Sequence, residues 1–181
     1  MTLVEEILAL YAEKGSEAYF GECVSVTEHG LQAAYFAQAA SAPPSLIVAA
    51  LLHDVGHLVE DVPADIAEWT TDAGHERVGA RWLAQRFPPQ VSEPVRLHVP
   101  AKRFLLATDP QYLSKLSPAS VVTLKLQGGP MSGAEVRNFE TERFHKEAVL
   151  VRRCDDQGKV AALRTPRLID YAAMIEQVAS R

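Results

Sequence analysis

Residues 46–58 read LIVAALLHDVGHL, and this stretch decides the fold. It is apolar almost all round until His53, which predicts one buried central helix over residues 46–58, and Pro44 suits a first helical turn just before it. An aspartate beside a histidine in such a helix is costly unless a partner or a bound metal compensates the carboxylate. The stretch therefore predicts a positively charged partner for Asp54.

Three pairs of polar residues mark helix starts on either side of this stretch. In each pair a serine or threonine is followed three residues later by a glutamate, which is the signature of a capping box. The pairs are Thr2 with Glu5, Ser25 with Glu28, and Ser132 with Glu135. Helices are expected to begin at these pairs, and the second of them to run to about residue 40.

Prolines and glycines set the limits of the remaining helices. The pairs Pro88-Pro89 and Gly128-Gly129 end helices that we expect over residues 71–87 and 120–127, and another helix is expected over residues 92–98. Thr165 and Pro166 open a last amphipathic helix. Weak strand signals occur only at residues 149–152 and 160–163. The chain is therefore predicted to be all-α, a helical bundle in a single domain over residues 1–181.

Composition excludes several classes of protein. The 181 residues are 48% hydrophobic and 23% charged, which is close to the globular average and excludes a disordered or collagen-like chain. The net charge of −5 gives no general attraction for nucleic acid or an acidic membrane surface, so any anion site must be local. No apolar run is long enough for a membrane span, and the acidic N-terminal segment does not read as a signal peptide. We expect a cytoplasmic protein.

The spacing of the histidines indicates a metal site. Four of them recur at intervals of 24, 22 and 23 residues, each about one helix plus a turn: His29, His53, His75 and His98. In an antiparallel bundle this spacing lets the four imidazoles converge on one interior point. Asp54 and a late acid, Asp155 or Asp156, add two carboxylates. Mixed imidazole and carboxylate ligation suits iron, manganese or zinc, and a bridging aspartate suits a metal pair.

The other two histidines are interpreted differently. His57 lies one turn after His53, where it can orient a ligand or the substrate. His145 is isolated on a polar stretch and is interpreted as structural.

The order His29, His53-Asp54 and a distant aspartate resembles the HD-domain superfamily of metal-dependent phosphohydrolases, an all-helical fold. The added His75 and His98 resemble its dinuclear subset. Within that subset, the chain is most similar to bacterial oxygenases of phosphonate degradation. These cleave the carbon–phosphorus bond of 1-hydroxy-2-aminoethylphosphonate or its N-trimethylated analogue, giving phosphate and glycine or glycine betaine. The resemblance covers nearly the whole chain.

Residues outside the histidines make this resemblance sharper. The family's mobile tyrosine and its partner glutamate, three residues apart, match Tyr19 and Glu22. Its phosphonate-binding lysine, four residues after the last ligand histidine, matches Lys102, although Pro100 departs from the pattern and is expected to bend the segment that delivers this lysine. The family's remaining substrate-binding side chains match Ser120, Gln127 and Arg152, and the arginine spacing selects Asp155 over Asp156 as the final aspartate.

The resemblance implies the following chemistry. Two iron ions, an Fe(II)/Fe(III) pair, are held by His29, His53, Asp54, His75, His98 and Asp155, and O2 is the co-substrate. Lys102 and Arg152 neutralise the phosphonate, with Ser120, Gln127 and His57 beside them. Glu22 pairs with the substrate's ammonium group, and Tyr19 occupies an iron position until substrate displaces it. An upstream 2-oxoglutarate-dependent hydroxylase is the implied pathway partner.

Three questions stay open at this stage. A trimethylammonium substrate would need aromatic walls, for which Tyr19, Phe20, Phe104 and Trp69 are candidates. An HD phosphohydrolase acting on a nucleotide or another phosphate ester is the alternative function, in which the metals activate water instead of O2. A non-catalytic helical module with a structural metal site is the third reading.

Overall fold

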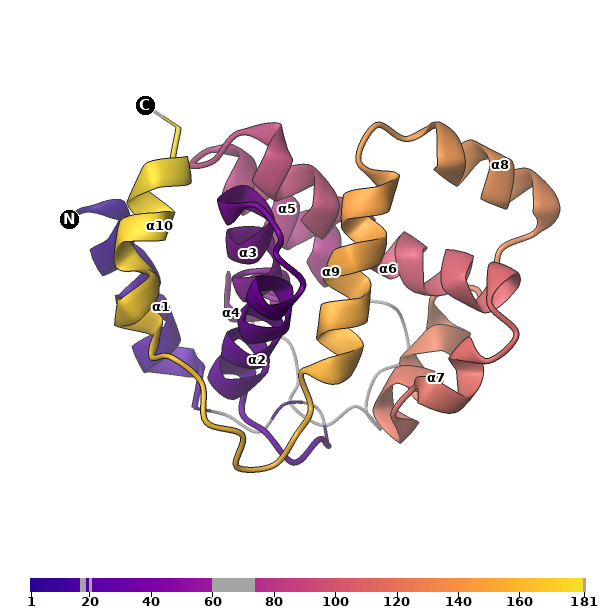
Figure 1. The fold of residues 1–181 in the computed structure, drawn as a ribbon, viewed down its shortest axis with the longest axis horizontal. Coiled ribbons are helices and arrows are strands. Elements are labelled where there is room, and N and C mark those ends of the chain that lie inside the picture. The colour runs from indigo at the N-terminus through magenta and orange to yellow at the C-terminus, as the bar shows by residue number, and fades with distance from the viewer. Residues whose placement is uncertain (17–18, 20, 60–73, 181) are drawn as a thin grey trace.

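The structure is a computed structural model, and it describes residues 1–16, 19, 21–59 and 74–180. Within these residues the regular elements are all helical (Figure 1), which confirms the predicted fold class. In chain order they are α1 (Leu3–Lys14), α2 (Val26–Ala39), α3 (Pro44–Leu51), α4 (Gly56–Val59), α5 (His75–Ala84), α6 (Pro89–Thr108), η2 (Tyr112–Lys115), α7 (Pro118–Leu126), α8 (Gly133–Thr141), α9 (His145–Gln157), η3 (Leu168–Tyr171) and α10 (Ala172–Val178).

The predicted helix signals at α1, α2, α7 and α8 are confirmed. All three capping boxes form with both of their hydrogen bonds, at the starts of α1, α2 and α8. α7 is capped by Ser117 and ends before Gly128 and Gly129, which have φ angles of +92° and +70°. Glycine adopts this left-handed region at little cost, and the chain therefore turns away from the helix axis at this pair.

The predicted single central helix over residues 46–58 is wrong. α3 ends at Leu51, and residues 52–55 form turns before the short helix α4. The His53 side chain causes the break, because its Nδ1 atom binds the Ala50 carbonyl oxygen at 2.8 Å. In a continued helix this carbonyl would accept from the backbone N–H of Asp54. His53 and Asp54 therefore lie in a turn that begins directly after a buried helix.

α6 is longer than the helix predicted over residues 92–98. It continues through Pro94 and Pro100 to Thr108, although each proline removes one backbone hydrogen bond. α6 packs against both α5 and α9, and this burial on two sides offsets the two lost bonds. Pro100 therefore does not end the helix, and Lys102 lies one turn after His98 on the same helix.

The two predicted strand segments are also wrong. Residues 149–152 belong to α9, where the buried residues Ala148, Val151, Arg152 and Asp155 follow the helical spacing i, i+3, i+4, i+7. The β-branched pair in this segment favours a strand locally, but packing against α6 and α2 decides for a helix. Residues 160–163 form no strand, because Val160 bonds through both its backbone groups to the side chain of Gln32.

Two predicted helix limits differ from those observed. The helix expected over residues 71–87 corresponds to α5, which ends at Ala84, and its expected start at residues 71–72 lies outside the described residues. The last helix begins later than Thr165 and Pro166 suggest. The chain is extended there, and a 3-10 turn capped by Arg167 and Asp170 leads into α10.

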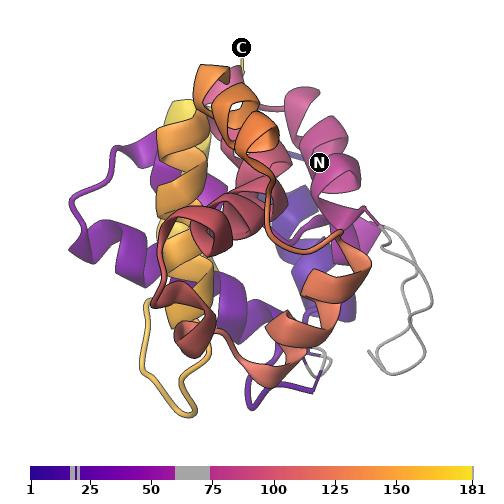
Figure 2. The same ribbon diagram turned by 90° about the vertical axis from the view of Figure 1, so that its right-hand side faces the viewer.

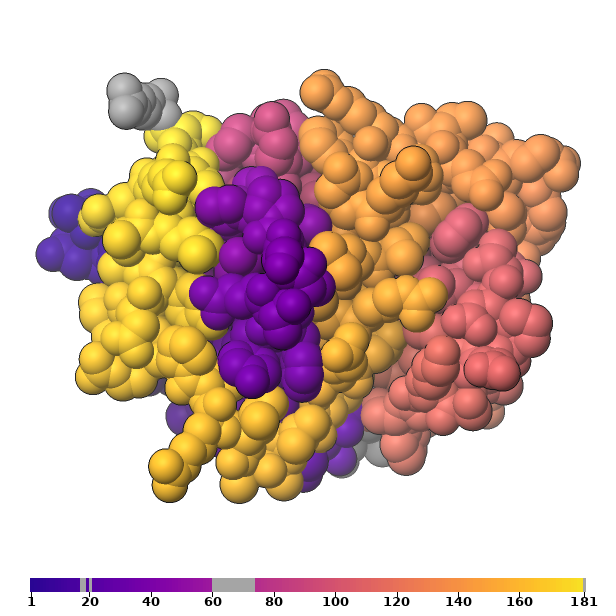
Figure 3. Space-filling view, in the orientation of Figure 1, coloured from indigo at the N-terminus to yellow at the C-terminus, as the bar shows by residue number. Residues whose placement is uncertain are grey.

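The helices are arranged around a centre formed by α2, α3, α6 and α9, with α1 and α10 packed together at one end of the molecule (Figure 1). α7 and α8 lie at the opposite end in Figure 1, and Figure 2 views the molecule from that end. On the face shown in Figure 3, α2 lies between the C-terminal segment and α9. The central helices contact one another directly, and they bring segments that lie far apart in the sequence to one point in the core. None of the described helices combines the length and apolar character that a membrane crossing requires.

Candidate functional site

Four histidines meet in the core with their Nε2 atoms turned towards one another. His29 Nε2 lies 3.1 Å from His53 Nε2, and His75 Nε2 lies 3.2 Å from His98 Nε2. They come from α2, from the turn after α3, from the first residue of α5 and from α6, and all four are buried. The convergence predicted from their spacing is confirmed.

Backbone carbonyls fix the orientation of three of these rings. The Nδ1 atoms lie 2.7–2.9 Å from carbonyl oxygens: His29 from Gly158, His53 from Ala50, and His98 from Val95. A carbonyl oxygen only accepts, so each Nδ1 carries a hydrogen and each neutral ring presents its Nε2 lone pair to the cluster. Lone pairs about 3 Å apart repel one another unless a cation lies among them. The donor set therefore fits a bound metal.

The Asp54 carboxylate lies between the two histidine pairs. Its Oδ2 atom is 3.5 Å from His29 Nε2 and 3.3 Å from His53 Nε2. Its Oδ1 atom is 3.3 Å from His75 Nε2 and 3.6 Å from His98 Nε2. Each pair thus forms a separate buried triad with one oxygen of the same aspartate. This arrangement suits two metal ions bridged by one carboxylate.

Asp155, and not Asp156, lies against the first triad as a fourth potential ligand. Asp155 Oδ1 lies 3.4 Å from His29 Nε2, and its Oδ2 atom lies 3.9 Å from His53 Nε2. Asp156 points elsewhere and pairs with Tyr112 and Arg152. The choice of Asp155 by its spacing from Arg152 thus agrees with the geometry, while its role as a ligand stays a prediction.

The pKa values of the cluster reflect its burial and its opposed charges. Burial alone would lower the pKa of His29, but the Asp155 and Asp54 carboxylates raise it to about 9. Burial and then the neighbouring rings of His75 and His53 lower the pKa of His98 to about 3. The Asp54 pKa is held well below its usual range by the surrounding histidines, although burial opposes this. Asp54 and His98 therefore have the ionised carboxylate and the neutral imidazole that metal ligation requires, whereas His29 would release a proton when a metal binds.

A glycine allows the second triad to form. A Cβ atom on Gly56 would lie 2.0 Å from the His75 carbonyl oxygen, so only glycine lets α4 approach the start of α5 this closely. His75 is the first residue of α5, and this close approach brings it to within reach of Asp54.

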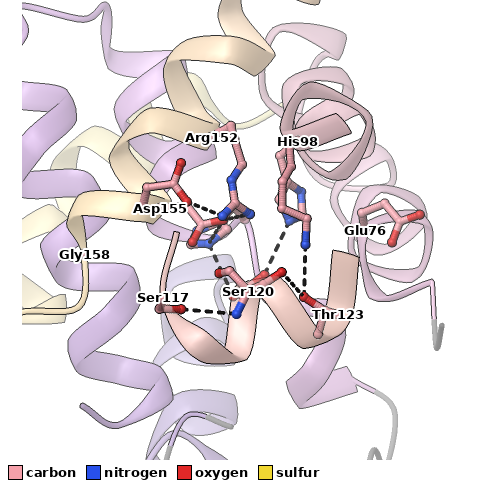
Figure 4. Close-up of polar contacts among 12 residues, drawn as sticks. Glu76, His98, Ser117, Ser120, Thr123, Arg152, Asp155 and Gly158 are labelled. Atoms are coloured by element: carbon pink, nitrogen blue, oxygen red, sulfur yellow. Dashed lines mark hydrogen bonds and ion pairs between the residues drawn. The ribbon is translucent and has the colours of Figure 1, made fainter. Parts of the chain in front are cut away.

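One cavity opens onto the cluster, and all seven predicted catalytic and substrate-binding side chains line it: Tyr19, Glu22, His57, Lys102, Ser120, Gln127 and Arg152. In Figure 4, the α7 residues Ser120 and Thr123 and the N-cap residue Ser117 lie below Arg152 and Asp155 on one side and His98 on the other. α7 therefore forms the wall of the cavity that faces the cluster.

Lys102 is the least compensated charge in this cavity. Its side chain is 2% exposed, and its ammonium donates to Thr123 Oγ1 at 3.0 Å. Burial, and then the nearby Arg152, lower the pKa of Lys102 to about 7. In the part of the chain that the structure describes, this ammonium forms no ion pair with a carboxylate. A bound anion would supply the missing counter-charge.

Arg152 is held by three neighbours. Its Nη1 atom lies 2.6 Å from Asp155 Oδ2, its Nη2 atom pairs with Asp156, and its Nε atom donates to Tyr112 Oη at 3.0 Å. The two carboxylates hold the Arg152 pKa well above its usual range despite burial. Arg152 is thus fixed at the cavity wall, but its charge is already shared with two acidic residues.

Tyr19 lies directly over the first triad. Its hydroxyl donates to Asp54 Oδ2 at 2.6 Å, and its ring stacks on His29 with centroids 4.0 Å apart. Burial, and then the charge of Asp54, raise the pKa of Tyr19 well above 10, so the phenol stays neutral. Tyr19 thus contacts two of the predicted metal ligands, while its occupation of an iron position and its displacement by substrate stay predictions.

The comparisons with known proteins agree with this geometry. A family model described as HD domain matches residues 26–156, more than half of the chain. The chain belongs to the HD-domain family. It is 41% identical over 179 residues to the [1-hydroxy-2-(trimethylamino)ethyl]phosphonate dioxygenase (glycine-betaine-forming) of Leisingera caerulea, covering 99% of this chain and 91% of that protein. It is 42% identical over 174 residues to the hydroxymethylphosphonate dioxygenase of Gimesia maris, covering 96% and 86%.

A third relative carries no activity in its name. The uncharacterized protein L432 of Acanthamoeba polyphaga mimivirus is 32% identical to this HD-domain chain over 170 residues, covering 93% of this chain and 77% of that protein.

Three polar residues at the HD-domain site were not predicted from the sequence. Lys159 donates to Ser120 Oγ at 2.9 Å, Thr123 accepts from Lys102, and Ser117 donates to Glu22. Lys159 and Thr123 carried a usable signal. Lys159 lies four residues after Asp155, and Thr123 lies between Ser120 and Gln127 at helical spacing.

The remaining predicted residues divide into three groups. His57 stacks on His75 with ring centroids 4.1 Å apart, and burial and the nearby His75 hold its pKa well below 6.5. Phe104 is not a cavity wall, because it packs on Phe139 in a second core cluster. His145 binds the Glu142 carbonyl oxygen outside the site, as its structural interpretation requires. Phe20 and Trp69 lie outside the described residues.

Proposed function

We propose that this chain is a dioxygenase that uses O2 to cleave the carbon–phosphorus bond of a small 1-hydroxyphosphonate. The two named relatives act on phosphonates that carry a hydroxyl on the carbon bonded to phosphorus. Adding one O2 to such a compound gives one carboxylic acid and one phosphate, with all atoms accounted for. The carbon–phosphorus unit loses four electrons and O2 gains four, so the reaction needs no external reductant.

One observation carries this proposal. Asp54 offers one oxygen to each of two histidine pairs, and the same cavity contains the buried ammonium of Lys102, which has no carboxylate partner among the described residues. A site for two cations thus adjoins a site for one anion. A phosphonate with an adjacent hydroxyl can present oxygens to the metals and its charge to Lys102 at the same time.

The proposed metals are two iron ions in the Fe(II)/Fe(III) state. His29, His53, Asp54 and Asp155 would hold one, and Asp54, His75 and His98 the other. Such a pair supplies a Lewis acid for substrate oxygens and one-electron chemistry for O2 when it is bound.

The cations and amides of the cavity would bind the phosphonate. Lys102 gains its missing counter-charge from the anion, which raises its pKa and keeps it protonated. Ser120 accepts from Lys159 and therefore has its own hydrogen to donate to a phosphonate oxygen. The buried Gln127 Oε1 atom, which has no hydrogen-bond partner among the described residues, can accept from a substrate hydroxyl. Arg152, fixed by its two aspartates, supplies a rigid donor edge.

Tyr19 and His57 would act on opposite sides of the cluster. The Tyr19 hydroxyl is bonded to Asp54 over the first triad, and substrate would displace it from that position. His57 is neutral and stacked on His75, so it can orient this ligand and present a ring nitrogen to substrate. Glu22 would face the substituent at C2 of the substrate.

Two broader expectations belong to the same proposal. A single domain over residues 1–181 is supported by the packing of α1 and α10 on each other and on the α3 and α4 segments of the centre. A cytoplasmic enzyme of this kind would depend on an upstream hydroxylase, of the 2-oxoglutarate-dependent class, to install the C1 hydroxyl of its substrate.

The test measures phosphate release by iron-loaded protein with and without O2. Three substrates are offered: hydroxymethylphosphonate, 1-hydroxy-2-aminoethylphosphonate and its trimethylammonio analogue. We expect release from at least one of them, only with O2, and one O2 consumed for each phosphate. Equal release without O2 would contradict the oxygenase, and phosphate released from a nucleotide or another phosphate ester, without O2 and with manganese in place of iron, would instead favour the phosphohydrolase. Absence of release from all three would overturn the proposal.

A further inference from the structure

Lys159 is a cation of the cavity to which the proposed reaction assigns no role. Its side chain is 10% exposed, and its ammonium lies 2.9 Å from Ser120 Oγ, 3.5 Å from Asp155 Oδ1 and 3.8 Å from Glu22 Oε1. It therefore connects three parts of the site: a phosphonate-binding hydroxyl, an acidic metal ligand and the carboxylate at the C2 end. Its contact with Glu22 bears on which substrates the cavity accepts.

The backbone on both sides of Lys159 is fixed. Gly158 gives its carbonyl oxygen to His29 Nδ1 at 2.9 Å. Val160 accepts from the Gln32 amide at 2.8 Å and donates to it at 2.9 Å. Both anchors come from α2, one turn apart. The ammonium of Lys159 is thus delivered to the cavity from a segment with little freedom to move away.

Glu22 is held from a second direction as well. The hydroxyl of Ser117, the N-cap residue of α7, donates to the same Oε1 atom that faces Lys159. The Glu22 carboxylate is therefore oriented by one hydroxyl and balanced by one ammonium. A cationic group at C2 of a substrate would be attracted by Glu22 and repelled by Lys159 at similar range.

We propose that Lys159 is a specificity-determining residue that balances the charge of Glu22 and so disfavours phosphonates with a cationic group at C2. This inference rests on the proposed function, because it concerns the choice among the substrates of that reaction. A substrate without such a group, such as hydroxymethylphosphonate, experiences neither charge strongly. The ratio of kcat/KM for a cationic and an uncharged phosphonate is therefore the quantity that Lys159 controls.

Substitution at either end of the pair moves this ratio in opposite directions. In Lys159→Met the carboxylate of Glu22 is unbalanced, and the ratio for the trimethylammonio substrate over hydroxymethylphosphonate should rise about tenfold. In Glu22→Gln the ammonium is unbalanced, and the ratio should fall by a similar factor. The double variant should return close to the wild-type ratio. Structural damage alone would lower both kcat/KM values together and leave the ratio unchanged.

The roles of Lys159 and Glu22 can also be tested by measuring phosphonate binding in the absence of turnover. Calorimetric Kd values for the two phosphonates, measured under nitrogen on iron-loaded protein, should shift in the same ratio. Lys125→Met is the matched control, because Lys125 is an exposed lysine of α7 and its loss changes the net charge equally. Iron content is measured on every sample, since Lys159 also contacts Asp155. If Lys159→Met does not fold, Lys159→Gln removes the same charge with a polar side chain and tests the same ratio.

The failures of the two proposals are distinguishable. If the wild type turns over none of the three phosphonates, the proposed function fails, and the binding ratio still decides the role of Lys159. If the wild type is active but both single variants keep its ratio in turnover and in binding, the inference about Lys159 is wrong. Binding of neither phosphonate would overturn both.

Discussion

The two halves of the cavity are held in different ways. In the histidine half, His29, His53 and His98 are oriented by backbone carbonyls. In the cationic half, Lys102 and Lys159 are held by hydroxyls and carboxylates of other side chains. A backbone anchor survives most substitutions around it, whereas a side-chain anchor is lost with one. The ring orientations in the histidine half should therefore tolerate substitutions around them, whereas the lysine positions in the cationic half should change with a single substitution.

The two halves also require opposite ligands. Burial lowers the pKa of His98 to about 3 and leaves a neutral ring whose Nε2 lone pair can bind a cation. Burial lowers the pKa of Lys102 to about 7 and leaves an ammonium that needs an anion. Asp54 and Arg152 lie on the cavity wall where the two halves meet. A substrate that is both an anion and a metal ligand satisfies both requirements at once.

The largest expected effect is the loss of the histidine half. Asp54→Ala removes the only carboxylate that both described triads share, so we expect it to lose both irons and all phosphate release. Metal analysis and the phosphate assay measure the two losses. Asp109→Ala, which removes an acid outside the cavity, should keep iron and activity. Iron retained at the wild-type level in Asp54→Ala would contradict the ligand assignment.

The histidine half was predictable from sequence because helix lengths control it. The four histidines recur at intervals of 22 to 24 residues, and this spacing lets them converge in a helical bundle. The turn at His53 was not predictable from local signals, since it arises when a side chain takes a carbonyl from the helix ladder. α9 was missed because its β-branched pair favours a strand until the packing against α6 is known.

The cationic half was predictable only through family resemblance. Lys102, Ser120, Gln127 and Arg152 come from α6, α7 and α9, and no helical periodicity brings these three segments together. Lys159 follows a helix end, in a segment with weak strand character, and its position depends on the hydrogen bonds of Gln32 to Val160. The spacing of Lys159 from Asp155 places it near that carboxylate, but the contacts of Gln32 that fix its position have no local signature in a single sequence.

The next effect is on stability and its pH dependence. The pKa of Lys102 falls from 10.5 to about 7 on folding, so between these values the unfolded chain binds more protons than the folded one. Stability then rises with pH over this window, and Lys102 destabilises the protein most at pH 7 and below. Lys102→Met should therefore be more stable than the wild type, by on the order of a few kcal/mol near pH 7 and by little near pH 10.

Urea unfolding of the metal-free proteins at several pH values measures this difference. Lys146→Met, at an exposed lysine of α9, should show no pH-dependent gap from the wild type. A gap that is constant with pH, or that grows as the pH rises, would contradict the buried charge of Lys102.

The same variant should be a weaker enzyme. Lys102→Met removes the charge that we assign to phosphonate binding, and charge-assisted hydrogen bonds contribute about 1.5–3 kcal/mol. We expect kcat/KM to fall about 100-fold while the iron content stays at the wild-type level. This split would separate the two halves of the cavity experimentally, because Asp54→Ala loses iron as well. Loss of iron in Lys102→Met would show that the halves depend on each other.

The smallest effect should come from Thr123, whose hydroxyl accepts a hydrogen bond from the Lys102 ammonium. Thr123→Val keeps the shape of the side chain and the Lys102 ammonium, but removes the hydroxyl that accepts from it at 3.0 Å. The substrate itself becomes the remaining partner, so we expect KM to rise about fivefold with kcat nearly unchanged, close to 1 kcal/mol in binding. Val122→Thr, an exposed neighbour on α7, is the control and should leave KM unchanged. A loss in Thr123→Val as large as that in Lys102→Met would mean that position, and not charge, governs the cationic half, which would then be as rigid as the histidine half.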